Sequence, residues 1–259
     1  MDRTLELASS PMAPGVSPVR VAYRDEGAGP PLVFLHGGWG YAFYPVHRPE
    51  GVRLIAPERT GYGRSTRVAS LPPRFHAAAA VEHARFLDAL GLERCVLWGH
   101  SDGAVIAAIM AIESPERYAG VVLEALHLER EKPRSRAFFT MMAEDPDGFG
   151  ERVTSKLAAD HGDTWRDVLR AGGRAWLDIA ATPDEDFFDR RLGEVSLPVM
   201  VMHGADDPRT EPGELERLRR EVPHAEWRVL PTAGHSPHSE RATREACRDL
   251  VATFVTRVS

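Results

Sequence analysis

Three residue types that together perform nucleophilic chemistry occur in this chain, each close to a glycine and each far from the others in sequence. Ser101 stands in the stretch WGHSDGAVIA, Asp206 and Asp207 in VMVMHGADDP, and His235 in PTAGHSPHSE. A serine hydroxyl becomes an effective nucleophile when a histidine takes its proton and a carboxylate orients that histidine. The sequence therefore predicts a Ser–His–Asp arrangement, provided that the fold brings these positions together.

The segment around Ser101 has the features of a serine held on a sharp turn between a strand and a helix. Gly99 and Gly103 flank it, the apolar run CVLW precedes it and AVIAAIMAI follows it. Such a turn requires glycines because side chains there would clash, and it directs the free amides of a helix N-terminus at the reacting centre. The alternative is an ordinary N-cap, whose hydroxyl satisfies the following helix. The carboxylates and the histidine at later strand ends favour the nucleophile.

The elements that must position these residues alternate along the chain. Short apolar runs predict buried strands in PPLVFLHGG, VRLIAPE, RCVLWGH, GVVLEAL, LPVMVMHG and EWRVLP. Helical patterns fall between them, over 73–90, over 102–115, in PGELERLRREV and over about 240–257. Near the N-terminus, VRVAYRDEG alternates and is expected to be one arm of an antiparallel hairpin. This alternation predicts an α/β fold with a mostly parallel sheet flanked by helices.

Residues 127–193 interrupt the alternation. The region is rich in charge and has no good strand, and its helical periodicity is clearest in FFTMMAED, GERVTSKLAADHG, WRDVLRAGGRAWLDIAA and DEDFFDRRLG. A structureless loop of this length is improbable inside a compact domain. We therefore predict a helical cap over 127–193, inserted into a core made of 1–126 and 194–259. The mixed charges of LEREKPRSR at 128–136 are expected to form a solvated loop or helix face.

Composition narrows the class of protein. The 259 residues are 43% hydrophobic and 27% charged with a net charge of −6, and no basic block points to nucleic acid. No apolar run approaches the roughly 20 residues that a membrane span needs, and the first residues lack the apolar segment of a secretory signal. Cys95 and Cys247 are too few for a disulfide framework and are expected to be buried thiols. We expect a cytoplasmic protein that acts on small molecules.

Taken together, these stretches resemble the α/β-hydrolase superfamily over nearly the whole chain. FLHGGW resembles the family's His-Gly oxyanion turn, PERTGYGRS its Gly-x-Gly-x-Ser loop, GHSDG its nucleophile elbow, HGADDP its acid turn and AGHSPHSE its histidine loop. The family's acid turn carries the carboxylate three residues after the glycine, which selects Asp207 over Asp206. The histidine loop selects His235 over His238. Glu58 departs from the pattern, since many relatives have aspartate there.

The resemblance implies a serine hydrolase that cleaves carboxylic esters of small molecules through an acyl-enzyme intermediate and without a cofactor. The backbone amides of Gly38 and Asp102 would form the oxyanion hole, where loss of one donor typically costs about 3 to 4 kcal/mol of barrier. No metal site is expected, because no further ligand stands at a suitable spacing from His235 and His238. A C–C bond hydrolase, an amidase or aminopeptidase, a cofactor-free perhydrolase and a slow-turnover ligand receptor stay open as alternatives.

Two features bear on the substrate. Trp39, beside the oxyanion turn, is expected to line the pocket. Ser-Asp within GHSDG resembles biphenyl-hydrolase-like enzymes that hydrolyse amino-acid esters such as valacyclovir, in which the aspartate is associated with the substrate's α-amino group; otherwise Asp102 caps local backbone or pairs with an arginine. The large apolar side chains of the cap either form a lid or only hold the cap together: Phe138, Phe139, Met141, Met142, Trp165, Trp176, Phe187 and Phe188.

Overall fold

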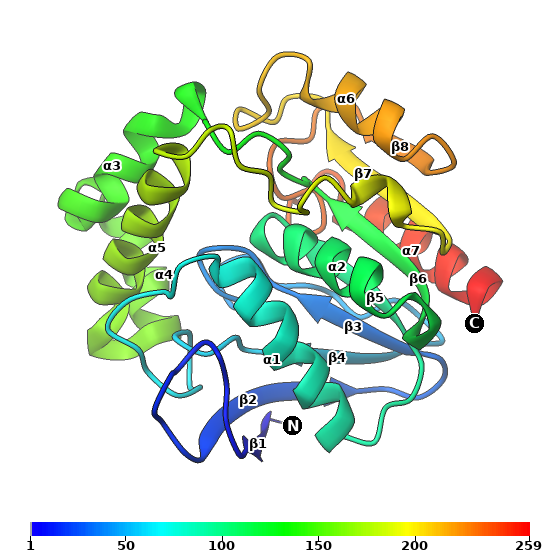
Figure 1. Cartoon of the computed structure of the whole chain (residues 1–259), viewed down its shortest axis with the longest axis horizontal. Coiled ribbons are helices and arrows are strands. Elements are labelled where there is room, and N and C mark those ends of the chain that lie inside the picture. Colours follow the sequence, from blue (N-terminus) through cyan, green and yellow to red (C-terminus); the bar gives the residue numbers. More distant parts are fainter. Residues whose placement is uncertain (1) are drawn as a thin grey trace.

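The computed structural model describes residues 2–259 and is built on one eight-stranded sheet (Figure 1). The strands lie in the order β1-β2-β4-β3-β5-β6-β7-β8, and β3 to β8 run parallel to one another. The strand VRVAYRDE pairs antiparallel with both of its neighbours, as expected for a hairpin arm. The strand bounds are β1 Asp2–Leu7, β2 Val19–Glu26, β3 Pro31–Leu35, β4 Arg53–Pro57, β5 Cys95–His100, β6 Tyr118–Glu124, β7 Val199–Gly204 and β8 Glu226–Leu230.

Helices cover both faces of the sheet, which confirms the predicted α/β fold. In Figure 1, α1 and α2 lie in front of the strands and α7 lies behind them. No helix within residues 2–259 is long and apolar enough to cross a membrane. The helix bounds are α1 Phe75–Ala89, α2 Asp102–Glu113, α3 Arg136–Glu144, α4 Glu151–His161, α5 Trp165–Ala180, α6 Glu214–Glu221 and α7 Arg244–Val258.

The central strands are apolar throughout because both of their faces are covered. Successive side chains of a strand point to opposite faces. Val33 and Leu35 of β3 accordingly pack in the cluster that includes α1 and α2, whereas Leu32 and Phe34 pack in the cluster that includes α7. Both cysteines, Cys95 and Cys247, are free and buried.

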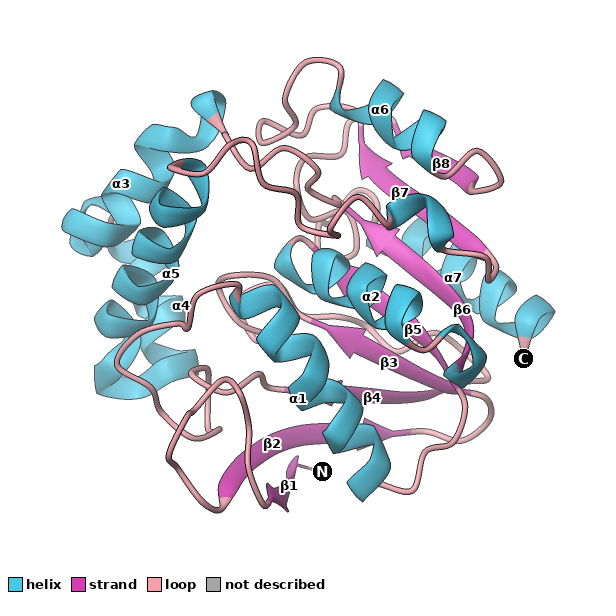
Figure 2. Cartoon of the chain, in the orientation of Figure 1, coloured by secondary structure: helices cyan, strands magenta, loops and turns pink. Residues whose placement is uncertain are grey.

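Helices α3, α4 and α5 stand together between β6 and β7 in the chain, to one side of the sheet (Figure 2). They correspond to three of the four helical segments expected in 127–193. The helix expected in DEDFFDRRLG is wrong, because that stretch consists of turns and a short 3-10 helix, Leu192–Glu194. Asp189 and Arg190 have φ angles of 52° and 63°, in the left-handed region that a right-handed helix excludes.

The chain that leads into this inserted segment, LEREKPRSR at 128–136, is more buried than its many charged residues suggested. Lys132 is only 3% exposed, and its Nζ donates to both carboxylate oxygens of Glu214 at 2.5 and 2.7 Å. Glu214 also accepts from the Leu128 amide at 2.7 Å. A buried charge is tolerated only when it is paired and hydrogen-bonded. The solvated loop expected for LEREKPRSR is therefore wrong at Lys132, because its partner lies 82 residues away on α6.

Candidate active site

Ser101 occupies the tight turn between β5 and α2. Its backbone angles, φ 55° and ψ −120°, are strained for a residue with a side chain. The turn depends on two glycines: a Cβ on Gly99 would lie 2.1 Å from the Gly103 carbonyl oxygen, and one on Gly103 would lie 1.9 Å from that of Leu35. The Ser101 hydroxyl makes no capping hydrogen bond to α2, so the N-cap alternative is not what holds it.

The structure brings Ser101, His235 and Asp207 into one hydrogen-bonded chain. Ser101 Oγ lies 3.0 Å from His235 Nε2, and His235 Nδ1 lies 2.9 Å from Asp207 Oδ2. Asp206 is exposed, whereas the Asp207 side chain is only 2% exposed. Because the Nδ1–H of His235 donates to the Asp207 carboxylate, the Nε2 atom of the neutral ring is free to accept the serine proton.

Burial and charge set the ionisation of this pair. Burial by itself would raise the pKa of the Asp207 carboxyl, but the contact with His235 and the Arg209 amide holds that pKa far below its ordinary value. Burial lowers the pKa of His235 from 6.5, and Asp207 opposes the shift. The resting state is therefore an ionised carboxylate beside a neutral imidazole, as a general base requires.

The loop that carries His235 is fixed from two sides. Glu240 accepts hydrogen bonds from the amides of Gly234 and Ser236 at 2.9 and 3.1 Å. The His235 carbonyl accepts from Nε2 of His100, the residue before the nucleophile, at 3.0 Å. Since burial lowers the pKa of His100 to about 3, that ring stays neutral and keeps a single N–H for this contact. The position of the imidazole is thus coupled to the nucleophile turn.

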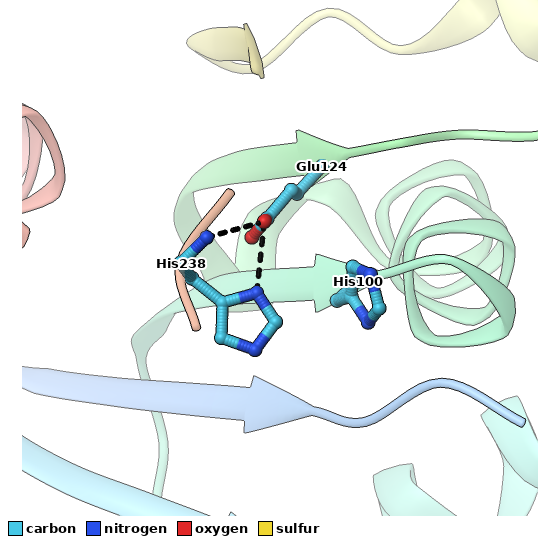
Figure 3. A group of neighbouring side chains, drawn as sticks. All are labelled: His100, Glu124 and His238. Atoms are coloured by element: carbon cyan, nitrogen blue, oxygen red, sulfur yellow. Dashed lines mark hydrogen bonds and ion pairs between the residues drawn. The ribbon is translucent and has the colours of Figure 1, made fainter. Parts of the chain in front are cut away.

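A buried carboxylate, that of Glu124, contacts this loop through His238 (Figure 3). Glu124, at the end of β6, accepts from the indole of Trp98 at 2.9 Å and from the amide and Nδ1 of His238 at 3.0 and 2.8 Å. The other nitrogen of His238, Nε2, lies 3.1 Å from the Tyr44 carbonyl oxygen. Both ring nitrogens of His238 therefore face oxygen atoms, one from Glu124 and one from the Tyr44 carbonyl.

These side chains also meet the distance requirement of a metal site. Within residues 2–259, ligand atoms of His100, Glu124 and His238 all lie within 4.8 Å of one another. Sequence spacing did not reveal this set, because its members come from the ends of β5 and β6 and from the loop between β8 and α7. Both nitrogens of His238 and both oxygens of Glu124 are already used in hydrogen bonds. We therefore describe the cluster as a hydrogen-bonded support for the His235 loop.

The two residues predicted to supply the oxyanion hole lie in the wall of one cavity. Gly38 and Asp102 both line the cavity that contains the serine hydroxyl. The Asp102 amide belongs to the first turn of α2, where N–H groups have no acceptor within the helix. A Cβ on Gly38 would lie 2.9 Å from Asp102 Oδ2, so glycine permits the close approach of the two segments.

The Asp102 carboxylate is held by protein groups. Its Oδ1 atom lies 3.0 Å from His76 Nε2 and accepts from the indole of Trp176 at 3.1 Å. Its Oδ2 atom lies 3.7 Å from Arg59 Nη2. Pairing with an arginine, one of the two roles considered from the sequence, is thus present. Recognition of an ammonium group by Asp102 stays a prediction.

A second histidine, which the sequence reasoning missed, contacts the nucleophile. His127 Nε2 lies 3.2 Å from Ser101 Oγ, and its ring stacks on that of His235 with centroids 5.5 Å apart. Because the serine donates its proton toward His235, His127 must donate its Nε2–H to the serine oxygen. Burial holds the pKa of His127 well below 6.5, so this ring is neutral. Its place just after β6, the strand beside β5, was the available signal.

A cavity of about 30 Å³ adjoins the serine. Trp39 lines it, together with four of the eight large apolar side chains of the inserted segment: Phe138, Phe139, Met142 and Trp176. Met141 is 38% exposed, while Trp165, Phe187 and Phe188 are buried away from the cavity. Some of these side chains thus lie over the cavity, whereas others pack elsewhere in the inserted segment or are exposed. Arg209, from the acid turn, is also in the wall.

The chain belongs to the alpha/beta hydrolase family, whose model matches residues 32–248. It is 28% identical over 268 residues to a 2-hydroxy-6-oxononadienedioate/2-hydroxy-6-oxononatrienedioate hydrolase of Paraburkholderia phymatum, with 89% of each chain covered. It is 36% identical over 112 residues to haloalkane dehalogenase 2 of Mycobacterium tuberculosis, a match that spans 40% of this chain and only 37% of that protein.

Two further proteins with similar sequences or structures are described as esterases. A bifunctional esterase/perhydrolase of Acinetobacter calcoaceticus is 26% identical over 223 residues, covering 73% of this chain and 79% of that protein. A thermophilic esterase from Thermogutta terrifontis has a similar structure, with a TM-score of 0.72, 22% identity and 99% of each chain covered. The structural similarity shows the fold, and the family defines the chain as an α/β-fold hydrolase.

Proposed function

We propose that the protein hydrolyses carboxylic esters of small molecules through an acyl-enzyme intermediate. The observation that carries this proposal is the unbroken hydrogen-bonded chain from Ser101 through His235 to Asp207, which ends in a cavity. His235 takes the hydroxyl proton as Ser101 Oγ bonds to the ester carbonyl carbon. The same proton then passes to the departing alkoxide, which leaves as an alcohol. Water, activated by His235, hydrolyses the acyl group and restores the serine.

The negative charge that develops on the carbonyl oxygen would be stabilised by the amides of Gly38 and Asp102. We propose residues 127–193 as the cap of this site and 1–126 with 194–259 as the core. Four cap side chains and Trp39 in the cavity wall support an acyl pocket that is mainly apolar. The neutral His235 supports activity at neutral pH.

Covalent labelling tests the nucleophile directly. The purified protein and its Ser101→Ala variant are treated with an organophosphonate, and intact mass and turnover of short-chain p-nitrophenyl esters are measured together. The proposal predicts one adduct and multiple turnovers for the native chain and neither for the variant. An adduct without turnover would favour the slow receptor, whereas turnover that persists in Ser101→Ala would exclude Ser101 as the nucleophile.

A further inference from the structure

One cation in the wall of the active-site cavity has no acidic partner. Arg209 follows the catalytic carboxylate by two residues, and its guanidinium lies over the ring of Phe138 on α3, 3.7 Å from the ring centre. Its Nε is buried and makes no hydrogen bond to any of residues 2–259. No carboxylate among those residues lies within 4.0 Å of the guanidinium. A buried donor without a partner is costly, so the site favours an acceptor from outside the chain.

The nearest acids are already committed. Asp207 and Asp102 act on Arg209 at longer range, but Asp207 binds His235 and Asp102 binds His76 and Trp176. Among the side chains of the cavity, the Tyr44 hydroxyl is the one that forms a hydrogen bond with the guanidinium. A phenol carries no charge at neutral pH, so no carboxylate among residues 2–259 balances the charge of Arg209 by direct contact.

The backbone of Arg209 is rigidly placed. Its amide donates to Asp207 Oδ1 at 2.9 Å, and its carbonyl accepts from Lys132 Nζ at 3.4 Å. Phe138 covers one face of the guanidinium, 3.7 Å from the ring centre. A planar fork of N–H donors matches the geometry of a carboxylate, which it can bind through two parallel hydrogen bonds.

We propose that Arg209 binds a second carboxylate of the substrate, so that the preferred esters are half-esters of dicarboxylic acids. This inference rests on the proposed ester hydrolysis and names its substrate class. In the bound state the free carboxylate pairs with Arg209 while the ester carbonyl lies against Ser101. The apolar side chains between them, such as Trp39 and Met142, would contact the carbon chain that joins the two carboxyl groups.

A matched pair of substrates tests the inference. Monoethyl glutarate carries a free carboxylate, whereas ethyl pentanoate has the same five-carbon acyl chain without it; the acid released from each is titrated. A charge-assisted hydrogen bond is worth about 1.5 to 3 kcal/mol, which corresponds to roughly 10- to 150-fold. We expect kcat/KM to favour monoethyl glutarate by at least tenfold. We expect Arg209→Met to lower kcat/KM for monoethyl glutarate at least tenfold more than for ethyl pentanoate. Arg209→Lys should show a preference for the half-ester between those of the native enzyme and Arg209→Met.

Arg166→Met is the matched control, because Arg166 also stacks on a cap aromatic, Trp165 at 4.4 Å, but lies outside the cavity. We expect it to keep the native preference. Equal losses on both esters in Arg209→Met, or a native enzyme that does not prefer the half-ester, would overturn the inference while leaving ester hydrolysis intact.

Binding separates this inference from the proposed function. Calorimetry on Ser101→Ala, which needs no turnover, should detect glutarate, with at least tenfold weaker binding in Ser101→Ala/Arg209→Met. If the phosphonate labels nothing and neither ester is cleaved, the proposed function fails, and glutarate binding still decides whether Arg209 is a carboxylate site. Absence of glutarate binding to Ser101→Ala would overturn it.

Discussion

Loss of the negative charge of Asp102 is expected to destabilise the whole protein, because it leaves a buried arginine unpaired. Arg59 and Asp102 have side-chain exposures of 1% and 3%, and Asp102 is the one acid within 4.0 Å of the Arg59 guanidinium among residues 2–259. The Arg59 guanidinium otherwise donates one long hydrogen bond, 3.4 Å to the His36 carbonyl, and lies over the rings of Tyr62 and Phe75, 4.5 and 5.7 Å away. Its Nε and Nη2 make no hydrogen bond to the described residues.

The magnitude follows from this isolation. Removing one partner of a buried ion pair typically costs 3 to 5 kcal/mol, about 3 here because the 3.7 Å separation is not a tight contact. Asp102→Asn should therefore lower the free energy of unfolding by about 3 kcal/mol. Arg59→Met should cost less, since His76 and Trp176 still hold the carboxylate. The double variant should cost less than the sum of the two single changes.

Urea unfolding of the native chain, both single variants and the double variant measures this coupling. Asp147→Asn is the control, because its pair with Arg166 is exposed (57% and 45%) and should contribute little. A cost below about 1 kcal/mol for Asp102→Asn, together with additive single changes, would refute the argument that Arg59 depends on this charge. Turnover of amino-acid esters and of acetate esters by the same variants shows whether Asp102 also binds an ammonium group, since that role predicts a selective loss on the amino-acid esters.

Three further outcomes are expected. His127→Ala should lower kcat/KM about tenfold, because the N–H of His127 stabilises the developing serine alkoxide by about 1.4 kcal/mol more than it stabilises the neutral hydroxyl. His127→Gln keeps a hydrogen-bond donor and should recover part of the loss. An unchanged kcat/KM in His127→Ala would exclude a role of His127 in stabilising the alkoxide. The pH profile of kcat/KM should rise to a plateau through an inflection below 6.5, because burial lowers the pKa of the base His235; an inflection above 6.5 would contradict this. Burial and Glu58 raise the pKa of Asp160, whose side chain is 7% exposed, from 3.8 to about 6, so this acid lowers the stability of the fold as pH rises from about 4 to about 6. Asp160→Asn should therefore increase the free energy of unfolding by up to about 3 kcal/mol at pH 7.5, seen as a higher melting temperature, and should have no such effect at pH 4. Equal effects at both pH values would refute the assignment.

The order of elements and the nucleophile turn were accessible from the sequence for local reasons. Apolar runs of strand length between helical stripes identified the α/β fold. Gly99 and Gly103 were informative because backbone atoms approach them so closely that any side chain at these positions would clash. By contrast, the helix expected in DEDFFDRRLG failed because periodicity does not report the left-handed angles of Asp189 and Arg190.

Contacts between distant segments were decided only by the tertiary structure. The sequence did not single out His127 or Arg209, and it predicted a solvated loop or helix face around Lys132. Nothing local distinguishes a polar residue beside a nucleophile from one in solvent. His127 meets Ser101 because β6 lies beside β5, and Lys132 is buried because Glu214 reaches it from α6. Local pattern thus determined most of the strands and helices and the nucleophile turn. The partner of each buried charge, and therefore its chemistry, depended on how those elements pack.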